Sequence, residues 1–370
     1  SGIIEREIRK EPLRSIEMAL DAFPDANLAL ISCPGEYATA EALKALNLGL
    51  DVMLFSDNIS EEDEIFLKKN AETEGLLMMG PDCGTAIVNG VPLGFANNVK
   101  KGSIGIVAAS GTGLQQVSCL SDRWGGGISQ AIGTGGRDLS TKVGGSTMIA
   151  GIDALAADSN TKVIVLISKP PSQDVAFKVL ERAAKTDKPV VVNFLGSTVE
   201  VPAGAEVTEA KTLEAAAHAA VRLTGIDVQT PARHLVTTGE LATLTNRLSG
   251  SQKYVRGLYS GGTFSYEAMI LLTEMLGPIH SASPLASEQN LDDPWQSREH
   301  TVLDLGGDVF TRGRPHPMID HRLRNERILQ EAMDPETAVI LLDIVLGFGS
   351  HENPAEDLAV AISEVRRATT

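Results

Sequence analysis

The chain has 370 residues, of which 43% are hydrophobic and 4% aromatic, and its formal net charge at pH 7 is −16. This length allows two or three domains, and the apolar content supports packed cores rather than a disordered chain. The negative charge repels phosphate backbones, which argues against general nucleic-acid binding. The longest apolar runs have the length of a strand, so none reaches the ~20 residues that cross a bilayer. We therefore expect no nucleic-acid partner and no membrane span, and any anionic ligand must be held by local donors.

The cysteines indicate the compartment. Cys33, Cys83 and Cys119 are scattered and odd in number, and no signal-like segment precedes them. This pattern favours a reducing cytoplasm over a disulfide-stapled secreted protein. The chain begins at Ser1 within a helix-like pattern. We expect residues 1–22 to be a helical segment or linker, in a fragment that has lost an upstream domain.

Residues 23–99 alternate strand-like and helix-like stretches. This βαβαβ rhythm predicts a parallel sheet with right-handed crossovers, and thus a Rossmann-like domain whose ligands lie beyond the carboxyl ends of its strands. No GxGxxG sequence follows the first strand, which argues against a nicotinamide-dependent dehydrogenase. The predicted strands are 28–32, 52–55 and 76–79, and the predicted helices are 36–47 and 61–74.

Residues 100–226 predict a second parallel α/β domain, whose last helix is Ala-rich and stops at Gly225, a good C-cap residue. Residues 227–252 are predicted to be a linker. Residues 253–370 repeat the pattern of the second domain but stop after a third strand and its helix, so we expect a truncated copy. The second domain is expected to have strands at 128–132, 162–168 and 189–194 and helices at 146–158, 172–186 and 212–224.

The second and third segments carry the same motifs in the same order. The sequence SIGIVAASGTG begins at residue 103, and YVRGLYSGGT begins at residue 254, with their Ser-Gly pairs 150 residues apart. Two further pairs of motifs follow at offsets of 171 and 176 residues. Ordered similarity at a long period favours two copies of one domain over a solenoid. Each copy places glycines where a strand turns into a helix, and backbone N–H groups can face an anion there.

Glycine-rich turns are the candidate anion-binding sites. They offer backbone N–H donors, and Arg137 adds a planar cation to one of them. The alternative for each is an ordinary turn with a Ser or Thr N-cap. Two matched turns could aim two helix N-termini at one site, which favours the functional interpretation. The candidate residues are Ser110, Gly111, Thr112, Gly113, Gly135, Gly136, Arg137, Gly306, Gly307, Gly347 and Gly349.

The sequence TRGRPHP at residues 311–317 is the densest cationic cluster in this acidic chain. Arg312, Arg314 and His316 could clamp a carboxylate, phosphate or acyl phosphate, and they are our candidate catalytic residues. The alternative is a solvated loop paired with nearby aspartates. His351 fits a solvated helix cap, and Cys83 is either a reactive thiol or, as we favour, a buried inert one. No HExxH, CxxC or paired-histidine spacing is present, so no metal site is predicted.

These motifs resemble the succinyl-CoA synthetase superfamily, most closely its FdrA branch of acyl-CoA synthetase-like proteins. GPDCG at 80–84 is similar to the turn that closes the CoA-binding domain of the α subunit. KGSIGIV at 101–107, with the following SGT, is similar to the start of the α ligase domain. LDLGG at 303–307 resembles LDVGGG of the β-subunit ligase domain. LYSGGT at 258–263 and GRPHPMID at 313–320 are FdrA-like hallmarks.

The resemblance covers nearly the whole chain. It implies a Rossmann-like CoA-binding domain followed by two flavodoxin-like ligase domains, one α-like and one β-like. It also implies CoA as a cofactor, and an acid–thiol ligase or an acyl or carbamoyl transferase as the enzyme class. The CoA-binding residues that it implies are Pro34, Gly35, Ser56, Asp57, Asn58, Pro81 and Cys83.

Two departures from the family pattern limit what the chain can do. The synthetases carry a histidine that is phosphorylated during turnover, in a GHAGA motif, whereas residues 194–205 contain no histidine. The phosphate-binding loop that precedes the CoA site of the family is missing, and no ATP-grasp domain is present. The resemblance therefore implies a relative without the phosphohistidine relay, and not a complete nucleotide-driven CoA ligase.

We expect an acyl-CoA synthetase-like protein that binds a small anionic carboxylate or an acyl phosphate between its two flavodoxin-like domains. It would carry out acyl or phosphoryl transfer without the phosphohistidine. One alternative is a carbamoyltransferase component, similar to oxamate carbamoyltransferase in purine-nitrogen catabolism, because carbamoyl phosphate arrives already activated. Another is a non-catalytic binding or assembly subunit. We expect partner subunits, and a homo- or hetero-oligomer.

Overall fold

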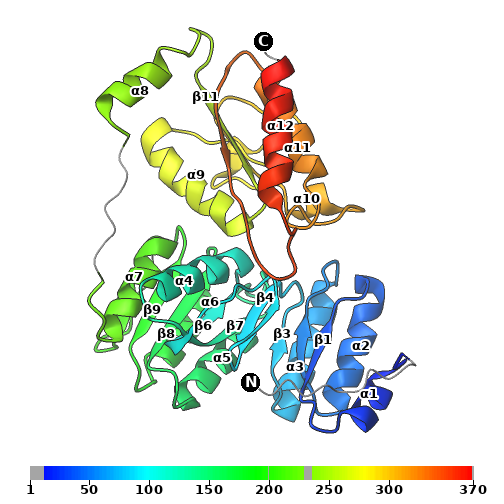
Figure 1. The fold of residues 1–370 in the computed structure, drawn as a ribbon. Coiled ribbons are helices and arrows are strands. Elements are labelled where there is room, and N and C mark those ends of the chain that lie inside the picture. The colour runs from blue at the N-terminus through cyan, green and yellow to red at the C-terminus, as the bar shows by residue number, and fades with distance from the viewer. Residues whose placement is uncertain (1–11, 199, 229–235, 369–370) are drawn as a thin grey trace.

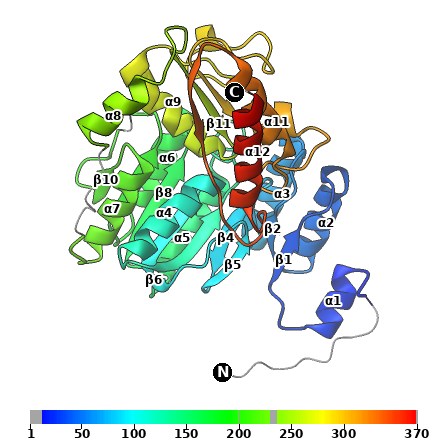
Figure 2. The same ribbon diagram turned by 45° about the horizontal axis from the view of Figure 1, so that its top comes forward.

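Three sheets follow one another along the chain in the computed structural model, which describes residues 12–198, 200–228 and 236–368 (Figure 1). The first two units lie side by side, and the third lies against the edge of both, as the tilted view confirms (Figure 2). The architecture is the predicted one, an α/β fold built on parallel sheets. Within these described ranges, every helix is too short or too polar to cross a bilayer.

The first unit is the predicted Rossmann-like βαβαβ arrangement. Its parallel strands lie in the order β1-β2-β3, with helices between them. Helix α3 begins where Ser60 accepts a hydrogen bond from the N–H of Asp63, and it ends at Gly75, whose φ of 67° suits a glycine C-cap. The elements are α1 (Ile16–Ala22), β1 (Leu28–Ile31), α2 (Gly35–Asn47), β2 (Asp51–Leu54), α3 (Glu61–Glu74) and β3 (Met78–Met79).

The second unit has a seven-stranded sheet in the order β10-β9-β8-β6-β7-β4-β5. Its five parallel strands have the flavodoxin-like order, with the first strand, β6, between the second and the third. Strands β8 and β9 are buried along their whole length, as their runs of Val and Ile require. The elements are β6 (Lys101–Ala108), α4 (Gly111–Arg123), β7 (Ile128–Gly133), α5 (Ser146–Ala157), β8 (Val163–Ser168), α6 (Gln173–Ala183), β9 (Val190–Phe194), β10 (Val207–Glu209) and α7 (Leu213–Leu223).

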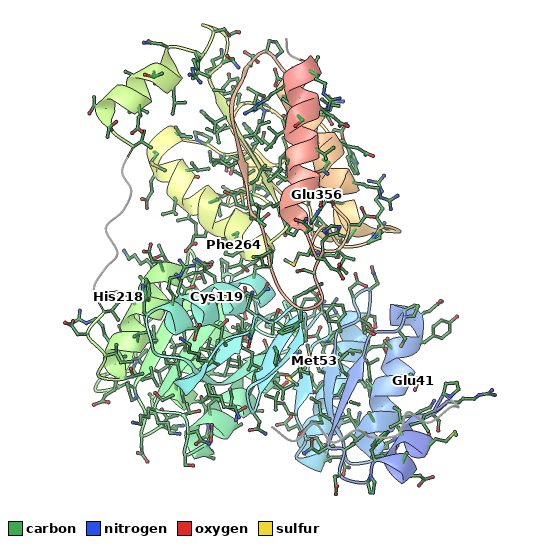
Figure 3. All side chains as sticks on the ribbon, viewed as in Figure 1. Glu41, Met53, Cys119, His218, Phe264 and Glu356 are labelled. Atoms are coloured by element: carbon green, nitrogen blue, oxygen red, sulfur yellow. The ribbon has the colours of Figure 1, made fainter. Side chains whose placement is uncertain are left out.

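A hairpin changes the expected boundary between these two units. Strands β4 (Thr85–Val88) and β5 (Val91–Gly94) were expected within the first domain, residues 23–99, but β4 pairs antiparallel with β7 of the second sheet. The hairpin has turn residues Asn89 and Gly90, both at positive φ, which is the geometry that ties two strands closely. The two sheets also share one apolar core, because Met53 and Met79 pack in the same cluster as Val107 (Figure 3).

The third unit repeats the first part of the second. Its parallel sheet has the order β12-β11-β13, so the first strand again lies between the second and the third. Helix α8 lies in the predicted linker, of which residues 229–235 are outside the described residues. The elements are α8 (Thr238–Thr245), β11 (Tyr254–Tyr259), α9 (Gly262–Leu276), η1 (Ser287–Gln289), β12 (Thr301–Asp304), α10 (Asp308–Thr311), α11 (Arg322–Met333), β13 (Thr337–Leu342) and α12 (Pro354–Ala368).

Contacts from α9 and from the segment after β13 help to dock the third unit on the second. Phe264, at the start of α9, packs on the apolar cluster beneath α4 (Figure 3). Residues 343–351, which we call the strap, leave β13 and reach the end of the β4–β5 hairpin (Figure 1). There the N–H groups of Phe348 and Gly349 donate to the carbonyls of Ala96 and Gly94, at 3.1 and 3.0 Å. The carboxyl ends of β6 and β11 therefore face each other.

Candidate functional site

A cavity of about 220 Å³ lies where the carboxyl ends of strands from all three units meet. Ligands of open α/β sheets bind at this edge, at the point where the strand order reverses. Here two such points face one cavity, because β6 and β11 are the central strands of their sheets. Its lining residues include Asp57, Asp82, Thr85, Ser110, Gly111, Thr112, Gly135, Gly136, Lys169, Gly262, Thr263, Asp304, Gly306, Asp308, His316 and Met318.

The N-terminus of α4 opens on this cavity. Ser110 is the N-cap, and its Oγ accepts a hydrogen bond from the N–H of Gly113 at 2.9 Å. The N–H groups of Gly111 and Thr112 have no acceptor within the helix, as for the first residues of any α-helix, and both residues line the cavity. The turn therefore offers two free donors and the positive end of a helix dipole to an anion.

The matching turn at the N-terminus of α9 is partly filled by a carboxylate, although its first helical residues, Gly262 and Thr263, also line the cavity. The N–H groups of Ser260 and Gly261 donate to the Asp343 carboxylate at 2.7 and 2.8 Å. Arg324, which is buried beside them, donates to the Asp343 carbonyl and to Ser260 Oγ. The two turns touch through the hydroxyls of Ser110 and Thr263, whose oxygens are 2.5 Å apart. The two helix ends thus meet as the repeat predicts, but a carboxylate of the protein occupies one of them.

Four carboxyl groups also line the cavity. They belong to Asp57 and Asp82 of the first unit and to Asp304 and Asp308 of the third. Crowding by protein atoms and repulsion from Asp57 and Asp308 raise the pKa of Asp82 to about 7, although its side chain is open to solvent. Burial likewise raises the pKa of Asp304. A ligand in the cavity therefore meets both amide donors and carboxyl groups.

Lys169 and His316 are the basic side chains among the described residues of the lining. Lys169 Nζ lies 3.9 Å from the Asp304 carboxylate and is half-exposed. Burial lowers the pKa of His316 to about 4, so the imidazole is neutral near pH 7. Its Nδ1 accepts a hydrogen bond from the N–H of Met318, so Nε2 carries the proton and can donate it. His316 is therefore a neutral donor rather than the cation of the predicted clamp.

The two arginines of the predicted clamp are outside the cavity lining, which corrects that expectation. Arg312 and Arg314 are both exposed, and the Arg314 guanidinium lies 5.2 Å from the centre of the Trp295 ring. Arg137 pairs with Glu64 at 2.9 Å and donates to the Ile59 carbonyl, so its charge fastens the second unit to α3. Arg312 and Arg314 are thus exposed to solvent, and Arg137 has a structural role.

The predicted glycine turns divide into two groups. Gly111, Gly135 and Gly136 lie at the cavity, whereas Gly113 donates to the Ser110 hydroxyl. The turn after β12 folds back on its own residue, because Gly306 N–H donates to the Asp304 carboxylate and Gly307 N–H to the Asp304 carbonyl. The turn at Gly347 and Gly349 belongs to the strap. The backbone of these last four glycines therefore makes intramolecular contacts, although Gly306 also lines the cavity.

The loops with the predicted CoA-binding residues do meet at one edge of the first sheet. Ser56 Oγ donates to the Cys33 carbonyl at 2.5 Å, and Gly35 approaches the backbone of Asp57 and Asn58 so closely that a side chain could not fit. Pro34 is the N-cap of α2, and Pro81 follows a cis peptide bond. Asp57 and Cys83 reach the cavity. Burial raises the pKa of the Cys83 thiol to about 12, which agrees with the inert alternative.

Several functional candidates were missed by sequence reasoning. Asp82 and Lys169 follow the ends of β3 and β8, a position that marks ligand contacts in parallel sheets and could have identified them. Thr85 lines the cavity beside Gly111, and its hydroxyl is buried with no partner among the described residues. Nothing in the sequence distinguishes this threonine, because the pairing of its hairpin with the second sheet is what places it there. Gly196, in the stretch without the family's histidine, packs against Tyr266 of α9.

Comparison with known proteins assigns the family. A model described as a CoA binding domain matches residues 99–196, and one described as CoA-ligase matches residues 258–370. The chain is 49% identical to YahF, an uncharacterized protein of Escherichia coli K12, over 95% of this chain and 68% of that protein. The chain belongs to the YahF family. The two domain matches place this family in the succinyl-CoA synthetase superfamily.

More distant relatives agree with this placement. The mitochondrial succinate–CoA ligase subunit alpha-2 of Trichomonas vaginalis is 31% identical over 47% of the chain, and the match spans 58% of that subunit. Among solved structures, the dinucleotide-forming acetyl-coenzyme A synthetase 1 of Ca. Korarchaeum cryptofilum matches 92% of this chain and 73% of its own, with 15% identity and a TM-score of 0.44. The two domain matches make the chain an acyl-CoA synthetase-like protein. The CoA-binding match falls on the second unit, whereas the resemblance had placed CoA binding in the first.

Proposed function

We propose that the chain binds a small carboxylate or an acyl phosphate at the α4 turn and takes part in acyl or phosphoryl transfer without a phosphohistidine. The observation that carries the proposal is the open α4 N-terminus, where Gly111 and Thr112 present N–H groups to a cavity between domains. Lys169 and the Nε2–H of His316 supply two further donors. The unpartnered Thr85 hydroxyl beside Gly111 is a fifth group that an anion would satisfy.

The same groups would act during the reaction. When a nucleophile attacks the carbonyl carbon of an acyl or carbamoyl phosphate, the bond between that carbon and the bridging oxygen breaks. The oxygen leaves with the phosphate, and negative charge collects on this departing phosphate. Donors that already point at this phosphate need no rearrangement, and removal of one such donor typically costs about 100- to 1000-fold in rate. The Gly111 and Thr112 N–H groups are rigid because they belong to a capped helix.

The cavity specifically favours the carbamoyltransferase alternative in one respect. A phosphate alone would use the amide donors but would give the carboxyl groups of Asp57, Asp304 and Asp308 little to accept. A carbamoyl group adds an NH₂, and carboxylates are good acceptors for its hydrogens. A ligand with an anionic end at α4 and an amide end toward the aspartates would use both sets of groups. This supports a carbamoyl phosphate-type ligand, as an FdrA-like member would take.

The first unit gives CoA a poor electrostatic fit. Residues 23–99 contain twelve acidic and three basic residues. Of the basic ones, Lys68 is buried in ion pairs with Glu64 and Asp138. The phosphates of CoA would therefore find few cations in this unit, and the proposed reaction does not depend on CoA. In acyl-CoA synthetase chemistry CoA supplies the thiol that accepts the acyl group.

Calorimetric titration with phosphate, acetyl phosphate, carbamoyl phosphate and CoA tests the proposal. We expect phosphate and carbamoyl phosphate to bind, and Lys169→Ala to weaken their binding roughly fivefold, since it removes a partly screened charge. Arg314→Ala is the matched control, because that arginine lies outside the cavity lining. If Arg314→Ala weakened binding and Lys169→Ala did not, the anion would bind at the 311–317 loop.

Turnover separates catalysis from a binding or assembly role. The protein would be mixed with carbamoyl phosphate, oxamate and candidate partner subunits, and release of phosphate would be followed. Phosphate release that depends on oxamate supports carbamoyl transfer. Binding of carbamoyl phosphate without phosphate release, with all partners present, would instead identify a non-catalytic subunit.

A further inference from the structure

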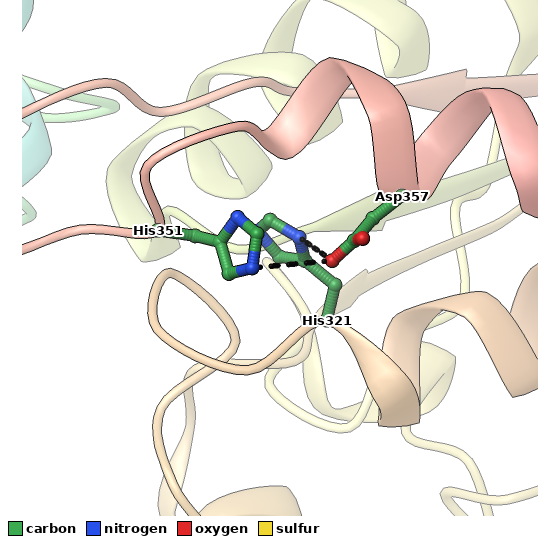
Figure 4. A group of neighbouring side chains, drawn as sticks. All are labelled: His321, His351 and Asp357. Carbon is green, nitrogen blue, oxygen red and sulfur yellow. Dashed lines mark hydrogen bonds and ion pairs between the residues drawn. The ribbon is translucent and has the colours of Figure 1, made fainter.

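A cluster of two histidines and an aspartate lies outside the cavity, in the third unit (Figure 4). His321 Nδ1 and His351 Nε2 lie 3.1 and 3.4 Å from the same oxygen of Asp357, and all three atoms are within 4.8 Å of one another. The three side chains come from separate segments: the N-cap of α11, the end of the strap and the first turn of α12. Three potential ligand atoms thus converge on one point.

The spacing of these atoms suits a metal ion. Zn²⁺ binds imidazole nitrogen and carboxylate oxygen at about 2.0–2.2 Å in a tetrahedron, so its ligand atoms lie about 3.3 Å apart. The two distances to Asp357 Oδ2 bracket that value. Two imidazoles and one carboxylate form a common ligand set for a divalent first-row metal, and they leave a coordination position for water. The Asp357 side chain is 40% exposed, which gives an ion a path in.

We propose that His321, His351 and Asp357 form a Zn²⁺-binding site that pins the strap to α11 and α12. Within this segment Val345 is buried, whereas the side chains of Ile344, Leu346 and Phe348 are exposed and do not anchor it. The strap also makes the backbone contacts that hold the third unit on the second, and these contacts lie one residue beyond the cavity wall at Phe95. The metal would therefore stabilise one wall of the cavity without entering it.

Metal binding requires a defined change of tautomer. In the observed arrangement His351 Nδ1 accepts a long hydrogen bond, 3.2 Å, from the N–H of Asn353, so Nε2 carries the proton that faces Asp357. A metal on Nε2 displaces that proton, which moves to Nδ1 of the same ring. The contact with Asn353 then opens, because two N–H groups face each other. The nearby guanidinium of Arg324 opposes a cation, and its pairing with Asp343 at 3.6 Å offsets that charge only in part.

The test uses the whole protein after removal of metals by a chelator, titrated with Zn²⁺ by calorimetry. We expect one tight equivalent per chain. His351→Gln and Asp357→Asn should each weaken it at least about 100-fold, since loss of even an outer-shell partner costs 10- to 100-fold. His218→Gln is the control, because His218 lies on α7 against Trp124 (Figure 3) and should bind Zn²⁺ like the parent. Zinc binding that is absent from the parent, or equal in all variants, would overturn the site.

Two further measurements use only the parent protein, so they do not depend on whether a variant folds. Co²⁺ should give the intense visible absorption of a low-coordinate site with nitrogen ligands, and hydrogen exchange of the Asn353 amide should become faster when Zn²⁺ is bound. The strap amides of Phe348 and Gly349 should become slower to exchange. A colourless Co²⁺ titration with unchanged exchange at these three amides would contradict the proposal. The anion site is tested separately, so either proposal can fail alone.

Discussion

The two repeated turns of this protein share a sequence pattern but differ in their hydrogen bonding. At α4, Ser110 caps the helix and the next two N–H groups face the cavity. At α9, Asp343 accepts the hydrogen bonds of Ser260 and Gly261. Strand register explains the difference: Ala108 pairs with Ile167 and Leu258 with Leu342, so the residue that corresponds to Asp343 is Ser168. One residue after the third strand thus decides whether the N–H groups just before the helix are bound by the protein or left for a ligand.

A duplicated fold therefore need not give a symmetric site. The α9 turn carries a buried ion pair, Arg324 with Asp343, and helps to hold the third unit together. The α4 turn keeps its donors for a ligand. Burial raises the pKa of Asp343, so its charge depends on the three donors around it. Substitutions at the two turns should therefore have different effects on stability and on anion binding.

The largest effect is expected from Asp343→Ala. The change leaves the Arg324 guanidinium buried without its carboxylate and frees the two N–H groups of the turn, so we expect a loss of about 3–5 kcal/mol in the free energy of unfolding. Urea unfolding followed by circular dichroism measures it. Asp153→Ala is the control, since its pair with Arg182 is exposed and should contribute about 1 kcal/mol or less. Equal losses in both variants would show that the α9 turn does not depend on Asp343.

Ser168→Asp should close the α4 turn in the same way. A carboxylate at this position would accept the hydrogen bonds that an anion otherwise receives, so phosphate should bind at least about tenfold more weakly, or about 1.4 kcal/mol. Ser168→Asn, which has nearly the same volume without the charge, is the matched control. Calorimetry on folded samples decides between them. Unchanged phosphate affinity in the aspartate variant would place the anion elsewhere.

Ser110→Ala should cost about 1 kcal/mol more stability than Thr263→Val. Both changes remove the hydroxyl contact between the turns, but only the serine also caps α4 by accepting from Gly113. Thermal or urea unfolding of the two variants gives the difference. If both were equally stable, the N-cap would contribute nothing and the α4 turn would not be rigid.

Asp82→Asn should flatten the dependence of stability on pH. The folded-state pKa of about 7 lies above the ordinary value near 4, so the native protein holds an extra proton between these pH values. Stability from this group is present at low pH and is lost as the pH rises from about 4 to about 7. The variant should lose less stability across this interval than the parent does. If Asp82→Asn instead lost more stability than the parent over this interval, the result would contradict the crowding of carboxylates at the cavity.

Much of the fold was readable from the sequence because local signals agreed with the packing. Ser60 and Gly75 mark both ends of α3, and the Val and Ile runs of β8 and β9 indicated strands covered on both faces. The hairpin at Thr85–Gly94 was assigned to the wrong unit, since its partner strand β7 follows more than thirty residues later. Local patterns do not report such long-range pairing.

The site was predicted only in part, for a related reason. The position of the α4 turn followed from its glycines, but the closure of the α9 turn depends on Asp343, which lies 83 residues beyond Ser260. The arginines at 312 and 314 were chosen for their charge, whereas the bend of the loop turns only His316 toward the cavity. Burial then makes that histidine neutral, an effect that depends on the surrounding domains.

A crystal structure of the protein soaked with phosphate tests the central claim most directly. We predict an anion within hydrogen-bonding distance of the Gly111 and Thr112 N–H groups, with Asp343 still bound to Ser260 and Gly261. An anion that displaces Asp343 from the α9 turn, or a cavity that stays free of phosphate at saturating concentration, would contradict the account.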